Sequence, residues 1–393
     1  MDFAFTPEEE AFRKEVQEFI DKEYPQEWRE NAAHDFLQAI GGSEDEQWER
    51  HRAMAKKLGA KGWLSLSWPK EYGGRNSMML MHILVEELAY HRCPGWDVFG
   101  DGMLAPMLLN SASEEQKRKY LPGIASGEVI WCEFLSERDA GSDLASLQTT
   151  AVEDGDYFVI NGQKCWTTGA HRADWGFIIL RTDPKAVPKH RGFSFFLLDM
   201  KTPGISITPI INMADEHEFN EVFFDNVRVP KENLLGEKNR GWYIVMGVLD
   251  FERSLNPIHA VVRRNLEELA EYIQKTRPLD PVMRNRIAEL LVECEVARLI
   301  HYRSIWMQDK GLIPNYEAAM DKMYSMELNQ RVNFTICQAL GHYGELIEGS
   351  KWVLWNGRAP YLYLRTVGNT LEAGSSEVDR IVIAQRGLGL PRG

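Results

Sequence analysis

The chain has 393 residues, enough for two or three domains, and hydrophobic residues make up 44% of it, so a large core can form. It carries 45 Lys and Arg against 58 Asp and Glu, a net charge of −13. This acidic balance disfavours a nucleic-acid partner, because phosphate backbones require a cationic surface. A few local arginines or amide donors can still hold a small anionic ligand.

The cysteines are scattered and odd in number, and no two form a CxxC pair: Cys93, Cys132, Cys165, Cys294 and Cys337. Neither a disulfide framework nor a metal site is expected, and the pattern favours a reducing compartment with mostly buried thiols. The acidic N-terminus has the features of neither a signal peptide nor a transit peptide. No apolar run approaches the ~18 residues that span a membrane. We therefore expect a cytoplasmic protein.

The first 130 residues have helical patterns separated by turns. Thr6 precedes Pro7 and lies three residues before Glu9, which predicts a capped helix start. Ser113 and Gln116 repeat this pattern, and apolar residues recur at helical spacing from Met78 to Tyr90. Residues 1–130 are therefore predicted to form an N-terminal α-helical domain.

Residues 131–240 show a different periodicity. Short β-branched and aromatic runs alternate with turn signals such as Asp154-Gly155, and Asn161-Gly162 is predicted to be a hairpin turn. The predicted strands cover residues 157–160, 177–180, 193–198, 205–210 and 222–229. This pattern indicates an antiparallel β domain.

Helical periodicity returns near Gly241 and lasts almost to the end of the chain. Residues 285–310 and 316–340 have no strand signature. Residues 241–393 are therefore predicted to form a C-terminal α-helical domain, and the order of the elements defines an α+β fold.

The usual dinucleotide and hydrolase motifs are missing: there is no GxGxxG after a strand, no Walker loop, no HExxH and no GxSxG. Residues 68–74, WPKEYGG, read as a loop with two turn glycines. Residues 134–143, FLSERDAGSD, place two hydroxyls and a glycine in a loop that enters the β domain. Successive N–H groups in such a loop can cradle a pyrophosphate, although a solvated turn has the same pattern.

Residues 161–169, NGQKCWTTG, place Trp166 beside Thr167 and Thr168. A flat aromatic cofactor needs an apolar wall and hydroxyl donors, and this segment offers both. Ordinary packing of a strand tryptophan explains the pattern equally well.

Residues 242–254 are predicted to form a helix in which Val245, Val248, Leu249 and Glu252 share one face. Glu252 therefore lies on the apolar stripe. Burial raises the pKa of a carboxylate, which suits a general base. An ion pair with a nearby arginine is the alternative.

These segments, in this order and over essentially the whole chain, resemble the acyl-CoA dehydrogenase family, as do FNEVFFDNVRVPKENLLG and LEAGSSEVDRIVIAQRGLGLPR further on. The resemblance implies an N-terminal helical domain, a middle antiparallel β-barrel and a C-terminal four-helix bundle. It implies a tetrameric flavoprotein that binds FAD, oxidises an acyl-CoA and passes electrons to an electron-transfer flavoprotein.

The resemblance also assigns roles to matching positions. It places Ser136, Trp166 and Thr168 at the flavin ring, and Gly141 and Ser142 near the pyrophosphate and the acyl-CoA. The further cofactor-binding positions are Phe134, Gln338, Gly341, Ser375 and Glu377. The further substrate-binding positions are Asp250, Phe251, Arg253, Ala373 and Gly374.

The family has two locations for the catalytic base. One is the position of Ala373, which cannot accept a proton. The other is the helix after the β domain, as in the isovaleryl-like branch, and there it corresponds to Glu252. Helical-face geometry and resemblance select the same residue, while Glu372, one position out of register, is the fallback. A base on this helix favours a branched or cyclic acyl group.

The chain departs from the family pattern at Arg138, which replaces a proline, and at His342, which replaces a glycine. The segment RxxFG is not recognisable between Ala260 and Ala288. Some bacterial relatives form tetramers of two unlike chains, so both a homotetramer and a heterotetramer remain open. The alternative functions are an FAD-binding partner subunit and an acyl-CoA oxidase.

Overall fold

The computed structural model describes residues 4–30, 45–252, 257–276 and 280–391, and of residues 248–252 the backbone alone. The chain divides into two compact units. The helical unit comprises Met1–Leu37, Ser77–Pro94 and Arg253–Gly393, and the sheet unit comprises Gln38–Asn76 and Gly95–Glu252. The division into domains 1–130, 131–240 and 241–393 stays a prediction. The described residues contain no helix that is long and apolar enough to cross a membrane.

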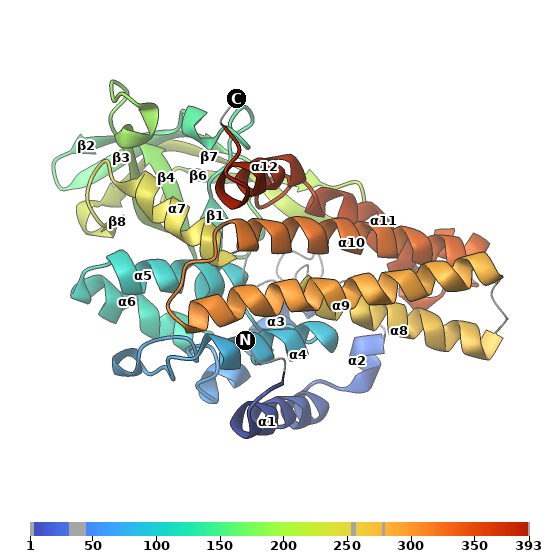
Figure 1. Ribbon diagram of the computed structural model, residues 1–393. Coiled ribbons are helices and arrows are strands. Elements are labelled where there is room, and N and C mark those ends of the chain that lie inside the picture. Colours follow the sequence, from blue (N-terminus) through green and yellow to red (C-terminus); the bar gives the residue numbers. More distant parts are fainter. Residues whose placement is uncertain (1–3, 31–44, 253–256, 277–279, 392–393) are drawn as a thin grey trace. The chain divides into compact units, whose positions relative to one another are not determined.

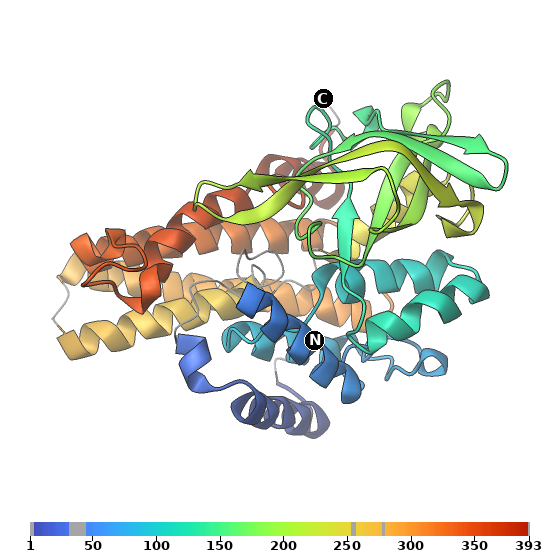
Figure 2. The same cartoon turned by 180° about the vertical axis from the view of Figure 1, so that it is seen from behind.

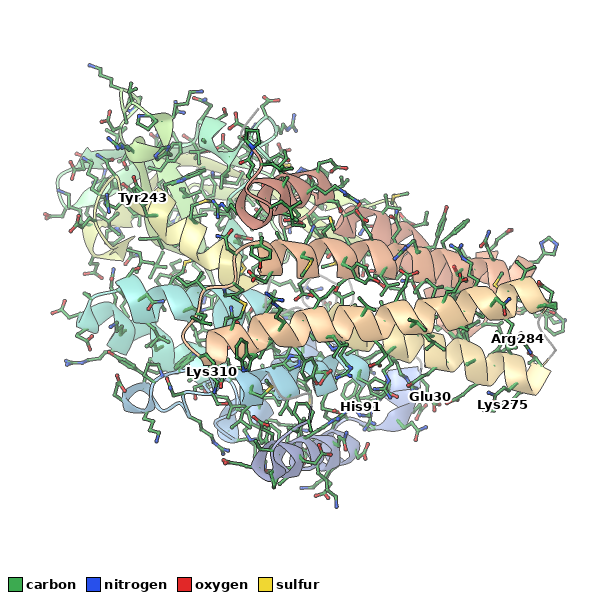
Figure 3. The ribbon with its side chains drawn as sticks, in the orientation of Figure 1. Glu30, His91, Tyr243, Lys275, Arg284 and Lys310 are labelled. Carbon is green, nitrogen blue, oxygen red and sulfur yellow. The ribbon has the colours of Figure 1, made fainter. Side chains whose placement is uncertain are left out.

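The helical unit contains the C-terminal bundle that was predicted. The long helix α10 packs against α8, α9 and α11, and Figure 1 shows α9 and α10 side by side. Figure 3 labels Lys275 and Arg284 near one end of the α8–α9 pair and Lys310 at the other end of α9. The helices are α1 (Pro7–Glu23), α2 (Gln26–Glu30), α4 (Met78–Tyr90), α8 (Ile258–Thr276), α9 (Pro281–Asp309), α10 (Tyr316–Leu340), α11 (Arg358–Asn369) and α12 (Ser376–Val382).

Helix α4 is buried on almost every side. Its residues from Leu80 to Ala89 are all buried, and it packs against α1, α8 and α9. Two ion pairs fix its position: Arg13 donates to Glu87 at 2.6 Å, and Arg92 donates to Glu268 on α8 at 2.8 Å. A helix that is buried on nearly every side belongs in the centre of a bundle, and α4 takes that place although it carries a histidine and two glutamates.

The sheet unit is built on eight strands in the order β6-β7-β3-β2-β4-β5-β8, with β1 beside β4. Figure 2 shows these strands from behind, in turquoise to yellow-green. Most pairs are antiparallel, as predicted, but β1 and β2 each pair with β4 in parallel. The helices are α3 (Asp45–Ala60), α5 (Ala105–Ser111), α6 (Glu114–Ala125) and α7 (Gly241–Glu252). The strands are β1 (Trp131–Phe134), β2 (Thr150–Asp154), β3 (Tyr157–Lys164), β4 (Trp175–Arg181), β5 (Phe193–Asp199), β6 (Ile205–Ile211), β7 (His217–Pro230) and β8 (Leu234–Leu235).

Both predicted capping boxes are confirmed, at Thr6 with Glu9 and at Ser113 with Gln116. The predicted hairpin turn at Asn161-Gly162 is wrong. Strand β3 continues through both residues, and its register against β7 shifts between Ile160 and Gly162, which marks a β-bulge. Gly162 has φ +140°, and a Cβ there would lie 2.7 Å from the Thr149 side chain. The Asn-Gly pair therefore supplies an unusual backbone conformation inside a strand.

Candidate active site

Two of the motifs meet in the sheet unit. The backbone N–H of Cys165 donates to the carbonyl of Ser136 at 2.9 Å, which joins the end of β3 to the loop after β1. The ammonium of Lys164 donates to the carbonyl of Leu135 at 2.9 Å and to the carboxylate of Glu137 at 3.0 Å. The loop of residues 134–143 is therefore fixed to β3 by both backbone and side-chain bonds.

The Lys164–Glu137 pair is buried, and its environment is strongly polar. Glu137 also accepts from the N–H groups of Gln148 at 2.6 Å and Thr149 at 3.0 Å. Burial lowers the pKa of Lys164 to about 8, against the opposing effect of the Glu137 charge. Burial tends to raise the pKa of Glu137, but Lys164 and the N–H donors outweigh it, and the pKa is lowered. The carboxylate therefore stays ionised beneath the loop.

Trp166 has a conformation that packing alone does not explain. Its φ is +64°, in the left-handed region, and its side chain is 57% exposed, with its ring at 81° to that of Phe219 and 5.8 Å between the ring centroids. A bulky residue in this region costs about 1–3 kcal/mol, and such strain concentrates at functional sites. An exposed indole face held in a strained backbone suits stacking against a flat ligand.

The residues after Trp166 are fixed to β7. Thr167 and Asn220 exchange two backbone hydrogen bonds of 3.0 Å, and the Asn220 amide donates to the carbonyl of Thr167 at 2.9 Å. The Thr167 hydroxyl is buried and has no hydrogen-bond partner among the described residues, while Thr168 is half-buried. Polar groups presented beside an exposed indole fit a flavin, which needs hydrogen-bond donors along its ring edge.

The outer part of the loop is open. Glu137 and Ala140 exchange two backbone bonds of 3.1 Å, which folds the loop into a tight turn. Gly141 and Ser142 are exposed beyond this turn, and a Cβ at Gly141 would meet no atom within 4 Å. Arg138 forms a two-point ion pair with Glu221 of β7, at 2.5 and 2.7 Å. Arg138, which stands where the family pattern has a proline, therefore anchors the loop to β7.

Phe134 faces away from this open side. Its side chain is fully buried and packs edge-on against Phe224, at 5.6 Å between centroids. Any contact of Phe134 with a cofactor would therefore come from its backbone.

The helical unit holds the C-terminal motif in a second strained loop. Ala373 has φ +53° and Gly374 has φ +90°. The buried ammonium of Lys322 donates to the carbonyl of Gly374 at 2.5 Å. Ser375 follows as the N-cap of α12 and accepts from the N–H of Val378 at 3.3 Å, with Glu377 exposed in the first turn. The loop thus presents backbone N–H groups at the start of a short helix.

Glu372 is restrained by its neighbours. Arg365 donates to its carboxylate at 3.1 Å, and Asn369 donates to its other oxygen. Although burial raises the pKa of a carboxyl group, the charge of Arg365 and the bond from Asn369 outweigh it, and the pKa of Glu372 is lowered. A carboxylate with a lowered pKa is a poor general base at neutral pH.

The remaining predicted residues fall into two groups. Gln338 is exposed near the end of α10, and Gly341 caps that helix with φ +61°. Asp250, Phe251 and Glu252 form the last turn of α7, and their side chains lie outside the described residues, as does the whole of Arg253.

Sequence reasoning missed four residues that hold these loops in place: Glu137, Lys164, Asn220 and Lys322. A signal existed for Lys164, because strand alternation from Phe158 and Ile160 places it on the buried face. No local pattern marks Lys322, whose partner Gly374 is 52 residues away.

Three family models match the chain in succession: the acyl-CoA dehydrogenase N-terminal domain over residues 6–128, the middle domain over residues 132–227 and the C-terminal domain over residues 239–388. The chain belongs to the acyl-CoA dehydrogenase family. It is an FAD-dependent oxidoreductase that acts on acyl-CoA thioesters.

The chain is 33% identical to the acyl-CoA dehydrogenase IpdE1 of Mycobacterium tuberculosis, over 98% of both chains. It is similar to the solved structure of the Tcur3481-Tcur3483 steroid ACAD, with 31% identity, full coverage of both chains and a TM-score of 0.91. The ChsE4-ChsE5 complex from Mycobacterium tuberculosis matches with 31% identity, full coverage of both chains and a TM-score of 0.86.

Proposed function

We propose that this enzyme dehydrogenates a CoA thioester with a bulky, ring-bearing acyl group between its α and β carbons, with Glu252 as the base. The description of one similar structure supports this substrate class, since it is a steroid ACAD. A base on the helix after the β domain agrees with a branched or cyclic acyl group, because it leaves the position of Ala373 free of a long side chain.

The observation that carries the proposal is that the loop before α12 has no carboxylate suited to act as a base. Position 373 is an alanine in a left-handed conformation, and the neighbouring Glu372 is held by Arg365 and Asn369 with a lowered pKa. This loop therefore contributes backbone donors and no free base. The proton acceptor must come from another element, and Glu252 at the end of α7 is the candidate on the apolar stripe.

In this proposal each residue has a simple task. FAD, when bound, would supply the acceptor for the β-hydrogen of the substrate. Glu252 takes the α-proton as the general base. The N–H of Ala373 donates to the thioester oxygen as negative charge develops there. Trp166 and Thr168 hold the flavin ring, and the loop at Gly141 and Ser142 receives the pyrophosphate. An electron-transfer flavoprotein would be the partner that reoxidises the cofactor.

An anaerobic titration of the purified flavoprotein with a panel of acyl-CoAs tests the proposal. The panel should include CoA thioesters of a steroid side chain, a branched short acid and a straight medium-chain acid. We expect the ring-bearing thioester to bleach the flavin band. Bleaching only by the straight-chain thioester would contradict the substrate class.

The base is tested with Glu252→Gln and a matched Glu372→Gln. General-base catalysis contributes ~10²–10⁴-fold, so Glu252→Gln should retain FAD and lose at least that factor in the rate of bleaching. Glu372→Gln should keep a rate near that of the wild type. The reverse pattern would assign the base to Glu372.

A second candidate is an enzyme that works only beside an unlike partner chain. Two similar structures are described as pairs, Tcur3481-Tcur3483 and ChsE4-ChsE5. His342, exposed at the end of α10, replaces a glycine in the region that resembles the family's contact with a neighbour's FAD. If the chain alone is colourless and becomes yellow and active when co-expressed with a second family member, the heteromer is correct. A yellow, active homotetramer would exclude it.

A further inference from the structure

A group of buried histidines and carboxylates lies in the helical unit and includes none of the residues assigned above. Ligand atoms of His82, Glu86 and His259 all lie within 4.8 Å of one another. His82 and Glu86 are one turn apart on α4, and His259 comes from α8. Their side chains are at most 9% exposed. Two imidazoles and a carboxylate are therefore gathered in the core of a bundle, where charged groups need compensation.

A chain of hydrogen bonds orients His82. The carboxylate of Asp321 lies 2.7 Å from Nδ1 of His301, and Nε2 of His301 lies 3.2 Å from Nδ1 of His82. Ser325 donates to the other oxygen of Asp321 at 3.2 Å. Since an ionised carboxylate can only accept, His301 donates from Nδ1 and, when neutral, accepts at Nε2 from His82. The Nε2 atom of His82 then carries a lone pair.

No described residue is a hydrogen-bond partner of this lone pair. Nε2 of His82 is buried, and it faces an oxygen of Glu86 at 3.8 Å. Glu86 itself accepts from Tyr302 at 2.9 Å and from Nε2 of His259 at 2.8 Å. Two electron-rich atoms therefore face each other in a buried setting, and a cation between them would satisfy both.

We propose that His82 Nε2, the Glu86 carboxylate and His259 Nε2 bind a zinc ion. Two histidines and one glutamate form a ligand set that zinc takes with water in the fourth position. The cation would replace the hydrogen between His259 and Glu86, and that hydrogen would move to Nδ1 of His259. Asp321 and His301 supply the outer support that orients a metal-binding histidine, and Tyr302 supports the carboxylate.

Two cavities offer an entry path. One of about 440 Å³ is lined by Glu86 and Tyr302, and one of about 220 Å³ is lined by Glu86 and His259. The arginines in their walls are paired with glutamates, Arg13 with Glu87 at 2.6 Å and Arg298 with Glu295 at 2.9 Å. A cation on this path therefore meets balanced charge.

The zinc would join α4 to α8 and stabilise the bundle without taking part in the redox reaction. A bound metal adds to folding stability because the unfolded chain lacks the assembled site. The site is thus independent of the proposed substrate and base, and its test does not rely on turnover.

The test measures zinc in the flavoprotein, loaded with Zn²⁺ and then dialysed, by inductively coupled plasma mass spectrometry. The variants are His82→Gln and His259→Gln, with His91→Gln as the control, a histidine directly after α4 that Figure 3 labels. We expect about one zinc per chain in the wild type and in His91→Gln, and at least a tenfold loss in the other two. A zinc chelator should lower the Tm of the wild type.

A second measurement requires no variant. Co²⁺ added to the metal-free wild type should give the intense visible bands of a four-coordinate site, and Zn²⁺ should abolish them. Three outcomes would each overturn the proposal: wild type that retains no zinc, His82→Gln and His259→Gln that retain as much as the wild type, or Co²⁺ that gives only the spectrum of the aqueous ion.

Discussion

The ammonium of Lys164 lies 3.0 Å from the carboxylate of Glu137, and both groups are buried in the sheet unit. Each charge compensates the other, and both hold the loop that carries Ser136. Removing one partner of such a pair leaves an isolated charge in the core, which costs far more than the pair contributes.

Lys164→Met should therefore destabilise the sheet unit by ~3–5 kcal/mol and weaken retention of FAD. Urea unfolding and the release of flavin fluorescence would measure both effects. Lys238→Met is the matched control, because Lys238 forms a more exposed pair with Glu153 at 2.9 Å and should cost less than ~1 kcal/mol. Equal losses in the two variants would show that the buried pair has no special role.

His171 should make the sheet unit sensitive to acid. Burial and the stacked ring of His217, 4.0 Å away, lower the pKa of His171 to about 4. The unfolded chain binds a proton near pH 6.5, so it takes up more protons than the folded chain between pH 6.5 and 4. The contribution of neutral His171 to the free energy of unfolding is therefore full above pH 6.5 and is lost as the pH falls from 6.5 to 4.

The slope due to His171 is at most ~1.4 kcal/mol per pH unit. His171→Gln should flatten the loss of unfolding free energy between pH 6.5 and 4, measured by urea denaturation at each pH. Because other histidines also titrate there, the informative quantity is the difference between wild type and variant. A difference that does not change with pH would refute the assignment.

Asp97 and Asp101 provide a test of buried acid pairing near the start of β1. Burial raises the pKa of Asp97 to about 6, against the opposing N–H donors, and burial together with the charge of Asp97 raises the pKa of Asp101 well above its usual range. Asp101 accepts from one backbone N–H, that of Asp97, at 3.1 Å. Asp97 accepts from the N–H groups of Trp131 at 2.9 Å and Phe99 at 3.0 Å, one on each oxygen.

Asp101→Asn should change the free energy of unfolding by no more than ~0.5 kcal/mol at pH 7, because the amide oxygen can still accept from the N–H of Asp97. Asp97→Asn should cost ~1–3 kcal/mol, since its new amide group cannot accept from one of the two N–H donors. Chemical denaturation of both variants measures these two changes in the free energy of unfolding. A larger loss in Asp101→Asn than in Asp97→Asn would show that the roles are reversed.

The bulge in β3 predicts different costs for two glycines in the same hairpin. Gly155, at the turn between β2 and β3, has φ +58° and open space around it, so Gly155→Ala should cost ~1 kcal/mol. Gly162→Ala adds a contact of 2.7 Å with Thr149 to the backbone strain. It should cost at least ~1 kcal/mol more, as measured by thermal unfolding. Similar Tm values for the two variants would contradict the packing argument.

Much of the fold could be predicted from local patterns. The helix at residues 316–340 has the predicted bounds, and the caps at Thr6 and Ser113 formed because their partners lie three residues away. The hairpin turn predicted at Asn161-Gly162 was wrong because this dipeptide indicates only an unusual φ, which occurs in a bulge as well as in a turn. The parallel pairing of β1 with β4 depends on segments 44 residues apart, and no local pattern encodes it.

The residues of the candidate site that lie in sequence motifs could be predicted, whereas the residues that hold those motifs in place could not. Trp166 and Thr168 stand in a recognisable segment, but the strain at Trp166 and its anchoring through Asn220 appear only in three dimensions. The cluster joins His82 and Glu86 of α4 to His259, which lies 173 positions after Glu86, so no local spacing in the sequence marks all three residues.

The placement of α4 has a consequence for how the chain is made. This mostly apolar helix lies in the first quarter of the sequence, yet α8 and α9, which cover it, are translated some 170 residues later. At a synthesis rate of ~5–20 residues per second, the apolar surface of α4 stays exposed for at least several seconds before α8 and α9 are made. A nascent chain stalled before residue 258 should therefore bind chaperones through α4, and a fragment that ends near residue 130 should aggregate.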